Sequence, residues 1–203
     1  MTRISQRAVR GQALPGDEFL AKSRFHDHQH QCDVVKIMPG ELYVASGRIA
    51  LATVLGSCVA ACIWDPITRI GGLNHFMLAS AGSNDGRGDS MRYGRYAMDT
   101  LILHVLAAGA LRHSLEAKVF GGAQVSRRFA SSDIGGDNAR FVLEYLREED
   151  IPVSAQDLGD TCPRKLYFFP DTGRVLMRRL PADASDSVLR EEQEYRQRIA
   201  QGA

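Results

Sequence analysis

The apolar run at residues 59–64 is the feature of this sequence that most restricts its fold. Its side chains, VAACIW, carry no charge, so a strand formed by them is apolar on both faces and belongs at the centre of a covered sheet. A second apolar run, residues 49–55, leads into Gly56, Ser57 and Cys58 just before it. The segment 65–68, Asp-Pro-Ile-Thr, is typical of a type I turn, because proline fixes φ at the second turn position. Residues 71–78 then predict the returning strand of a central hairpin.

Two helices and several further strands are predicted around this hairpin. Apolar side chains recur at helical spacing in residues 91–108 and 137–149. Short apolar runs bounded by turn residues predict strands at residues 34–38, 117–120, 165–169 and 174–178. Because the strands do not alternate regularly with helices, the pattern favours a mixed α+β class over repeated βαβ units. We therefore predict a layered α/β domain whose strand-rich core is packed by two amphipathic helices.

The chain divides into one globular domain and two different ends. Its 203 residues suit a single domain. Residues 1–32 are polar, show no sustained period of 2 or 3.6, and predict a flexible arm. The domain is expected at residues 33–181, and residues 182–203 predict a highly charged helix. Residues 79–89, rich in glycine, aspartate and serine, predict a mobile loop of the kind that often borders a site.

Composition excludes several classes of protein. A hydrophobic content of 44% and a net charge of +1 exclude a disordered tail or a collagen-like chain. The same balance argues against nucleic acid as a partner, since phosphate binding normally leaves a strongly basic face. No apolar stretch approaches the roughly 20 residues that a membrane-spanning helix needs, and the N-terminus lacks the apolar region of a secretory signal. We expect a cytoplasmic protein without membrane insertion, whose four cysteines are free thiols.

An alternating tract of potential metal ligands lies in the predicted arm. His26, His28, His30 and Cys32 offer imidazole and thiolate groups that suit zinc or copper. No second set of ligands stands at the spacing of a zinc finger, so the simpler interpretation is a solvated polar segment. Neither a metal nor an organic cofactor is predicted, and a metal-sensing protein remains a rival hypothesis.

The hairpin brings a thiol and an imidazole together. If Asp65 and Thr68 pair across the turn, continuing that pairing along both strands places Cys58 opposite His75, on one face of the sheet. A neighbouring imidazole can take up the thiol proton and leave a nucleophilic thiolate. The inference depends on register, because a slip of one residue would bring Phe76 across from Cys58 instead.

Such a pair needs supporting groups. A third group must orient the imidazole, and the candidates are the side chains of Thr53, Ser57 and Asn74. Backbone N–H groups around Gly56, Ser57 and Cys58 are candidate donors to an oxyanion, because glycine lets the chain turn its amides toward a carbonyl oxygen.

A purely structural interpretation of the same residues stays open. Cysteine in an apolar strand is among the most commonly buried residue types, and a histidine in a strand is usually just hydrogen-bonded in place. Cys62, on the same strand face as Cys58, is interpreted as structural, and Cys162 as incidental.

The motifs resemble those of the chemoreceptor glutamine deamidase family, CheD. The runs TVLGSCV at residues 53–59 and GGLNHFML at residues 71–78 are similar to its signature. Further matching motifs follow in the family's order: Pro39-Gly40-Glu41, Arg92-Tyr93-Gly94, KVFGGA at 118–123, Ile134-Gly135 with Asn138, Asp157-Leu158-Gly159 and Arg164-Lys165. The resemblance therefore covers residues 34–180 or so. Departures at Arg95 and at residues 160–163 affect the expected loop shape and partner recognition rather than the chemistry.

The resemblance implies a cytoplasmic enzyme that hydrolyses glutamine side chains to glutamate on the signalling helices of methyl-accepting chemotaxis receptors, in support of chemotactic adaptation. It implies that Cys58 is the nucleophile, that His75 is its base, and that a thioester forms without a cofactor. A threonine completes the family's catalytic set, and Thr53 is the match unless Ala52 occupies that place. The implied fold is a layered α/β core related to the catalytic domains of deamidating toxins.

Two other functions remain open at this point. Some members of the family dock a CheC-type phosphatase, so the chain could be a regulatory binding partner with little turnover. The same Cys–His pair could also serve an amidohydrolase that acts on small amides.

Overall fold

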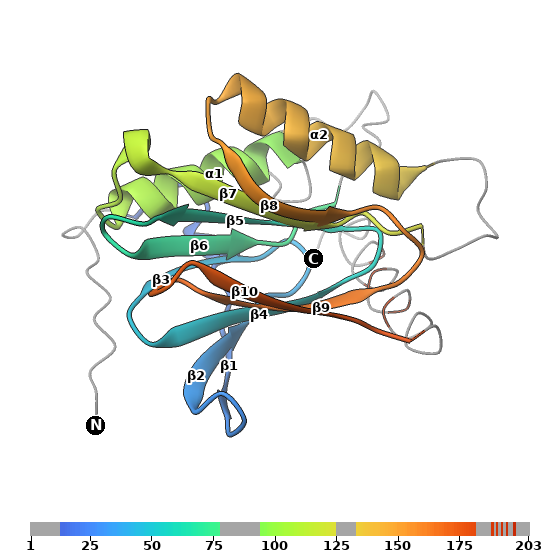
Figure 1. Cartoon of the computed structure of the whole chain (residues 1–203), viewed down its shortest axis with the longest axis horizontal. Helices are drawn as coiled ribbons and strands as arrows, with labels where there is room; N and C mark the ends of the chain where they lie inside the picture. Colours follow the sequence, from blue (N-terminus) through green and yellow to red (C-terminus); the bar gives the residue numbers. More distant parts are fainter. Residues whose placement is uncertain are drawn as a thin grey trace.

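Two β-sheets stack face to face, and two helices lie on the outer side of one of them (Figure 1). The computed structural model describes residues 13–77, 94–124 and 133–181, together with Val188, Arg190, Glu192, Glu194 and Gln197. The elements, in chain order, are η1 (Asp17–Phe19), β1 (Ser23–Asp27), β2 (Cys32–Lys36), β3 (Leu42–Ser46), β4 (Ile49–Leu55), β5 (Val59–Asp65), β6 (Ile70–Asn74), α1 (Gly94–Ala107), η2 (Arg112–Ser114), β7 (Glu116–Gly121), α2 (Ile134–Glu148), β8 (Val153–Leu158), β9 (Arg164–Phe169) and β10 (Arg174–Arg179).

The inner sheet has the strand order β3-β6-β5-β7-β8, and the outer sheet has the order β1-β2-β4-β9-β10. β5 is central in the inner sheet and pairs antiparallel with β6 and β7. Side chains alternate along β5: Val59, Ala61 and Ile63 pack toward the helices, whereas Ala60 and Cys62 pack in the layer between the two sheets, as does Cys58 just before the strand. This arrangement confirms the predicted α+β class and explains why the run at residues 59–64 is apolar on both faces.

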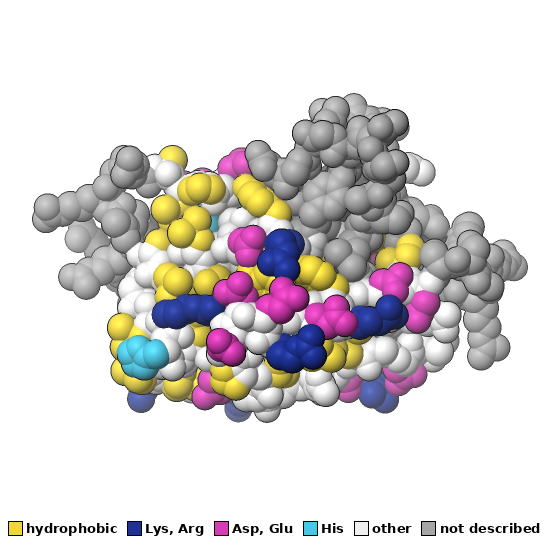
Figure 2. All heavy atoms as spheres, turned by 90° about the horizontal axis from the view of Figure 1, so that it is seen from above, with side chains coloured by type: hydrophobic (Ala, Val, Ile, Leu, Met, Phe, Trp, Pro, Cys, Tyr) yellow, Lys and Arg dark blue, Asp and Glu magenta, His cyan; other side chains and the backbone are white. Residues whose placement is uncertain are grey.

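The helical face carries interleaved charges of both signs, as Figure 2 shows. Exposed ion pairs of this layer include Arg95 with Glu148 at 2.8 Å and Arg112 with Glu149 at 2.8 Å. Such pairs contribute little to stability, because water screens them, and the mixture of signs agrees with the near-neutral net charge. Within the described residues, no helix combines the length and the apolar character needed to cross a membrane.

The structure differs from the sequence-based expectation at the sheet edges. β1 lies within the segment predicted to be a flexible arm, and it pairs antiparallel with β2 at the edge of the outer sheet. β3 and β8, which the sequence patterns did not predict, are the two edge strands of the inner sheet. Edge strands are solvated on one side and need no continuous apolar run, so their pattern is weak. The predicted loop at residues 79–89 lies outside the described residues. Of the predicted C-terminal helix at residues 182–203, the described residues Val188, Arg190, Glu192, Glu194 and Gln197 have helical backbone.

The central hairpin has a different register from the predicted one. Asp65 pairs with Ile70 rather than with Thr68, because the loop contains Pro66, Ile67, Thr68 and Arg69. Arg69 adopts a left-handed conformation with φ 57°, and its N–H donates to the Asp65 carbonyl at 2.8 Å. The shift of two residues preserves the face of every side chain, since side chains alternate with a period of two.

The Asp65 side chain anchors this turn. It is fully buried, and its carboxylate accepts hydrogen bonds of 2.6–2.8 Å from the Ile67 and Leu111 N–H groups and from the Thr68 and Ser114 hydroxyls. Burial on its own raises the pKa of Asp65, but the hydrogen bonds outweigh that effect and hold the pKa well below its ordinary value. The carboxylate therefore joins the hairpin to η2 as a charged, fully bonded group.

We expect Asp65→Ala to lower the free energy of unfolding by about 2–4 kcal/mol, because it leaves several buried donors without an acceptor. Urea unfolding monitored by circular dichroism measures the effect. Glu144→Ala, at an exposed position of α2, is the matched control and should stay within about 0.5 kcal/mol of the wild type. Equal stability of the two variants would show that the Asp65 network contributes nothing.

Candidate active site

Residues 56–58 connect β4 of the outer sheet to β5 of the inner sheet. This Gly-Ser-Cys stretch, the crossing segment, therefore passes from one layer to the other. All three of its carbonyl oxygens accept hydrogen bonds of 2.8 Å. The Gly56 carbonyl accepts from the Ala123 N–H, and the Cys58 carbonyl accepts from the Gly122 N–H. The Ser57 carbonyl accepts from the side-chain amide of Asn138. Gly121, with φ 111°, passes so close to the Cys58 carbonyl that any Cβ would collide with it. The carbonyl groups are therefore fixed toward β7 and α2.

His75 follows β6 and is fixed by its backbone. Its N–H donates to the Glu41 carbonyl at 3.0 Å, and its own carbonyl accepts from the Gly40 N–H at 2.8 Å. The Glu41 carboxylate in turn accepts from the Met38 N–H at 2.9 Å. The Pro39-Gly40-Glu41 motif thus forms a turn that holds the histidine backbone on both sides.

Thr53, on β4 of the opposite sheet, orients the His75 ring. The Thr53 hydroxyl lies 2.8 Å from the Ile37 carbonyl oxygen and 2.9 Å from His75 Nδ1. A hydroxyl has one proton, and a carbonyl can only accept, so Thr53 donates to Ile37 and accepts from His75. We therefore assign the imidazole proton to Nδ1, which leaves a lone pair on Nε2.

The environment of His75 keeps its imidazole neutral. The side chain is 1% exposed, and within the described residues its Nε2 is a buried atom with no hydrogen-bond partner. Burial lowers the pKa of His75 to about 3, although the nearby Ile37 carbonyl acts in the opposite direction. A buried polar atom without a partner is costly in a folded protein, which makes Nε2 a candidate for a functional role.

Cys58 shares the layer between the sheets with His75. When the hairpin register is continued past β6 through the bridge between Val59 and Phe76, Ala60 stands opposite His75 and Cys58 stands opposite Met77. Cys58 and His75 are therefore diagonal neighbours on one face rather than directly opposed. The directly opposed pairing predicted from the sequence is wrong, whereas the shared face is confirmed.

Cys58 and Cys62 lie on the same strand face in different settings. Both are buried in the layer between the sheets, but Cys58 is the last residue of the crossing segment, whereas Cys62 lies within β5. Burial raises the pKa of the Cys62 thiol and keeps it protonated and unreactive. This setting agrees with the structural role predicted for Cys62.

Two backbone amides of the crossing segment converge on one oxygen atom. The N–H groups of Gly56 and Cys58 donate to Glu192 Oε1 at 3.3 and 3.2 Å, and the Ser57 hydroxyl donates to Glu192 Oε2 at 2.7 Å. The Glu192 side chain is 3% exposed. Paired N–H groups aimed at one oxygen are the arrangement that stabilises an oxyanion in acyl-transfer enzymes. Two of the three amides predicted as oxyanion donors, those of Gly56 and Cys58, thus point at one atom, and no sequence pattern indicated that Glu192 would contact them.

The three groups considered for orienting the imidazole differ in what they contact. Thr53 contacts His75, whereas the Ser57 hydroxyl contacts Glu192. The Asn74 side chain accepts from the Ala61 N–H and donates to the Ala97 carbonyl, both at 3.0 Å, and so fastens α1 to the inner sheet. Ala52, the alternative to Thr53, packs on the far face of the outer sheet.

The residues of the N-terminal His/Cys tract are dispersed along the β1–β2 hairpin. His26 Nδ1 lies 3.0 Å from the Asp33 carboxylate, and the His30 ring packs against the rings of Tyr167 and Phe169. In the part of the chain that the structure describes, no group of three or more His, Cys, Asp or Glu side chains is placed to hold a metal ion.

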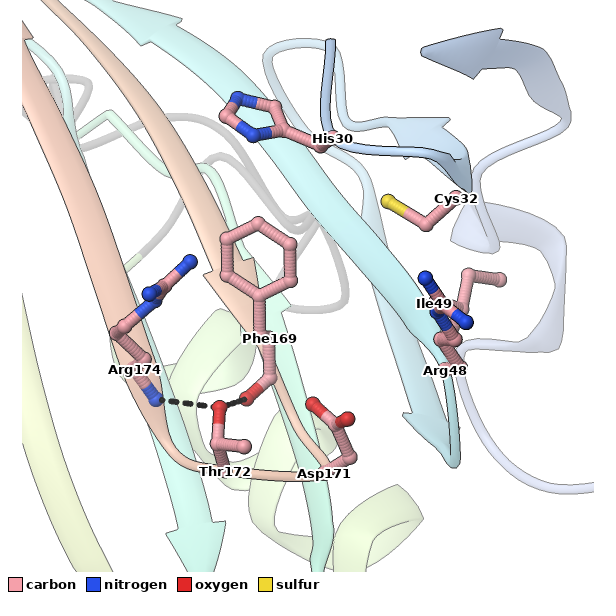
Figure 3. Close-up of a pocket in the computed structure, with 8 residues that line it drawn as sticks. All are labelled: His30, Cys32, Arg48, Ile49, Phe169, Asp171, Thr172 and Arg174. Atoms are coloured by element: carbon pink, nitrogen blue, oxygen red, sulfur yellow. Dashed lines mark hydrogen bonds between the residues drawn. The ribbon is translucent and has the colours of Figure 1, made fainter. Parts of the chain in front are cut away.

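A surface pocket of about 290 Å³ lies between this hairpin and the β9–β10 turn (Figure 3). Its lining residues are His30, Cys32, Arg48, Ile49, Phe169, Asp171, Thr172 and Arg174. The pKa of the Cys32 thiol is raised, mainly by burial and further by the Asp27 carboxylate, so the thiol stays protonated. The pocket is on the outer sheet, away from the Cys58–His75 layer, and lacks an activated nucleophile.

Comparison with known proteins identifies similar sequences over most of the chain. The CheD family profile, described as CheD chemotactic sensory transduction, matches residues 77–179. A protein named "Probable chemoreceptor glutamine deamidase CheD 1" from Dechloromonas aromatica is 50% identical over 184 residues, which cover 91% of this chain and 92% of that protein. Two further relatives carry the name "Probable chemoreceptor glutamine deamidase CheD". The protein from Thiobacillus denitrificans is 49% identical over 90% of this chain and 92% of that protein. The protein from Bordetella petrii is 52% identical over 79% of this chain and 72% of that protein.

The low pKa of His75 predicts a pH-dependent stability. The unfolded chain takes up a proton on this residue near pH 6.5, whereas the folded protein does so only near pH 3. Between these values the unfolded state binds more protons, so the free energy of unfolding falls as the pH is lowered, by up to about 1.4 kcal/mol per pH unit from this residue. Urea unfolding at several pH values in this range measures the slope.

We expect His75→Asn to have a shallower slope than the wild type, and His113→Asn, at an exposed histidine, to keep the wild-type slope. Identical slopes in all three proteins would contradict a neutral, buried His75.

Proposed function

The chain belongs to the CheD family, and we propose on that basis that it is a protein-glutamine deamidase acting on chemoreceptors. The reaction hydrolyses particular glutamine side chains on the helical signalling domain of methyl-accepting chemotaxis proteins to glutamate and ammonia. The observation that carries the proposal is the Thr53–His75 hydrogen bond, because it leaves a basic Nε2 lone pair in the layer that contains Cys58.

The first half of the reaction forms a thioester. His75 Nε2 accepts the thiol proton of Cys58, and the thiolate attacks the glutamine Cδ atom. Because burial disfavours the imidazolium, the resting imidazole is neutral, and charge separates only as the bond forms. His75 then returns the proton to the departing nitrogen, and ammonia leaves.

The second half regenerates the enzyme. Water gives a proton to His75 Nε2 and adds to the thioester carbonyl, and collapse of the adduct releases glutamate and the Cys58 thiol. In both halves the developing oxyanion is stabilised by the Gly56 and Cys58 N–H groups, whose orientation is fixed by the hydrogen bonds on the other side of the crossing segment. Thr53 acts as a positioning residue that holds the ring and its tautomer.

We place this activity in the cytoplasm, where the new carboxylates would serve as methylation sites in chemotactic adaptation. We also propose that a CheC-type phosphatase can bind this chain, in a regulatory role. The docking of the receptor helix involves the surface around the crossing segment, since the catalytic groups lie there.

Co-expression with a chemoreceptor cytoplasmic domain tests the proposal. Each conversion of glutamine to glutamate adds about one dalton, and peptide mass spectrometry locates the sites. We expect Cys58→Ala to lower the rate of conversion by at least about 10³-fold, because it removes the nucleophile.

Cys62→Ala is the matched control, because it removes a second buried thiol from the same strand face, and it should retain conversion. Conversion that persists in Cys58→Ala would refute the thiol mechanism. Absence of conversion by the wild type, with several receptors of the source organism, would leave the chain as a binding partner with little turnover.

A further inference from the structure

The carboxylate of Glu192 occupies the position that a substrate carbonyl needs. Its Oε1 atom receives both backbone N–H groups of the crossing segment, and its Oε2 atom receives the Ser57 hydroxyl. All three donors belong to residues 56–58, the segment that ends in the proposed nucleophile Cys58. A glutamate side chain is also the chemical product of glutamine deamidation. The enzyme's own chain thus places a product group at its oxyanion donors.

The segment that carries Glu192 approaches as a helix. Val188, Arg190, Glu192, Glu194 and Gln197 have helical backbone, and residues four apart lie on the same face of a helix. Val188 is 6% exposed and, like Glu192, packs against Gly56, where an added Cβ would lie 3.1 Å from Val188 Cγ1 and 3.0 Å from Glu192 Oε1. Arg190, Glu194 and Gln197 are exposed. One face of the helix therefore covers the crossing segment, and the absence of a side chain at Gly56 permits the close approach.

We propose that Val188 and Glu192, which share one helical face, form an intramolecular product mimic that occupies the substrate site and inhibits the enzyme until a receptor helix displaces it. The proposal rests on the deamidase function proposed above. It accounts for a nucleophile that is fully buried, although a deamidase must bring its thiol to a glutamine of another protein. It also assigns a register to the substrate: a receptor helix would place its glutamine at the position of Glu192 and a small apolar residue four positions earlier, at that of Val188.

Glu192→Gln converts the mimic into a substrate. If Glu192 occupies the substrate position, the carboxamide introduced there stands at the oxyanion donors beside Cys58, and the enzyme hydrolyses it. The Cys58 thiolate adds to Cδ, the C–N bond breaks with release of ammonia, and water hydrolyses the thioester to restore glutamate at position 192 and the free thiol. One water molecule is consumed and one ammonia is released.

Peptide mass spectrometry of the full-length purified variant measures this conversion. We expect at least about 90% of position 192 to be recovered as glutamate in Glu192→Gln, and as glutamine in the double variant Cys58→Ala/Glu192→Gln. The matched control is Glu194→Gln, at an exposed position of the same segment, which should keep its amide. When wild-type protein is mixed with the double variant, the amide should persist, because the reaction is intramolecular.

The outcomes separate this proposal from the deamidase function. If the Glu192→Gln variant keeps its amide at position 192 while it deamidates a co-expressed receptor, the product-mimic proposal is overturned and the function stays intact. Equal conversion at positions 192 and 194, or conversion of the double variant by added wild type, would also overturn it. Failure of both the receptor and position 192 to react would refute the deamidase function, and the proposal with it.

Kinetics on a receptor fragment supply a second readout. An intramolecular competitor reduces the fraction of enzyme that is open to substrate and so raises the apparent KM without changing kcat. If the closed form makes up about 90% of molecules, Glu192→Ala should lower KM about 10-fold at constant kcat. An unchanged KM in Glu192→Ala would contradict inhibition by the segment.

Discussion

The hydrogen bond between Thr53 and His75 is the interaction on which the rest of the site depends, because it joins the two sheets at the point where the chemistry is proposed. Burying an imidazole with one unbonded nitrogen is unfavourable, and the Thr53 hydroxyl offsets part of that cost by accepting from Nδ1. The same bond selects the tautomer. A feature that helps the sheets to pack therefore also determines which nitrogen is available to Cys58.

The crossing segment connects the Cys58–His75 layer to Glu192, the residue through which we propose that the enzyme is inhibited. Because the chain changes sheets at residues 56–58, its carbonyls accept from Asn138 of α2 and from the two residues after β7, while the amides of Gly56 and Cys58 point toward Glu192. The proposed nucleophile and the proposed oxyanion donors thus come from one short segment, and a ligand that binds these donors also covers the thiol. The product-like contact of Glu192 follows from this compact arrangement.

Comparison of sequence and structure shows which features are encoded locally. The central hairpin, the two helices and the shared face of Cys58 and His75 were predictable from apolar periodicity, and an error of two residues in register did not matter, because faces repeat every two residues. The edge strands β3 and β8 were missed, since half-solvated strands have a weak pattern. Glu192 was missed for another reason: its partner Cys58 is 134 residues away, and a charged helix gives no local signal of a buried contact.

The most direct test of the proposed chemistry is the protonation state of the His75 ring, measured by nitrogen NMR on protein with isotope-labelled histidine. Near pH 7 we expect the proton to reside on Nδ1 and Nε2 to carry a lone pair, and we expect Thr53→Val, which removes the acceptor for Nδ1–H, to disturb this tautomer. A proton found on Nε2 in the wild type would contradict the mechanism, because His75 would then lack a base for the Cys58 thiol.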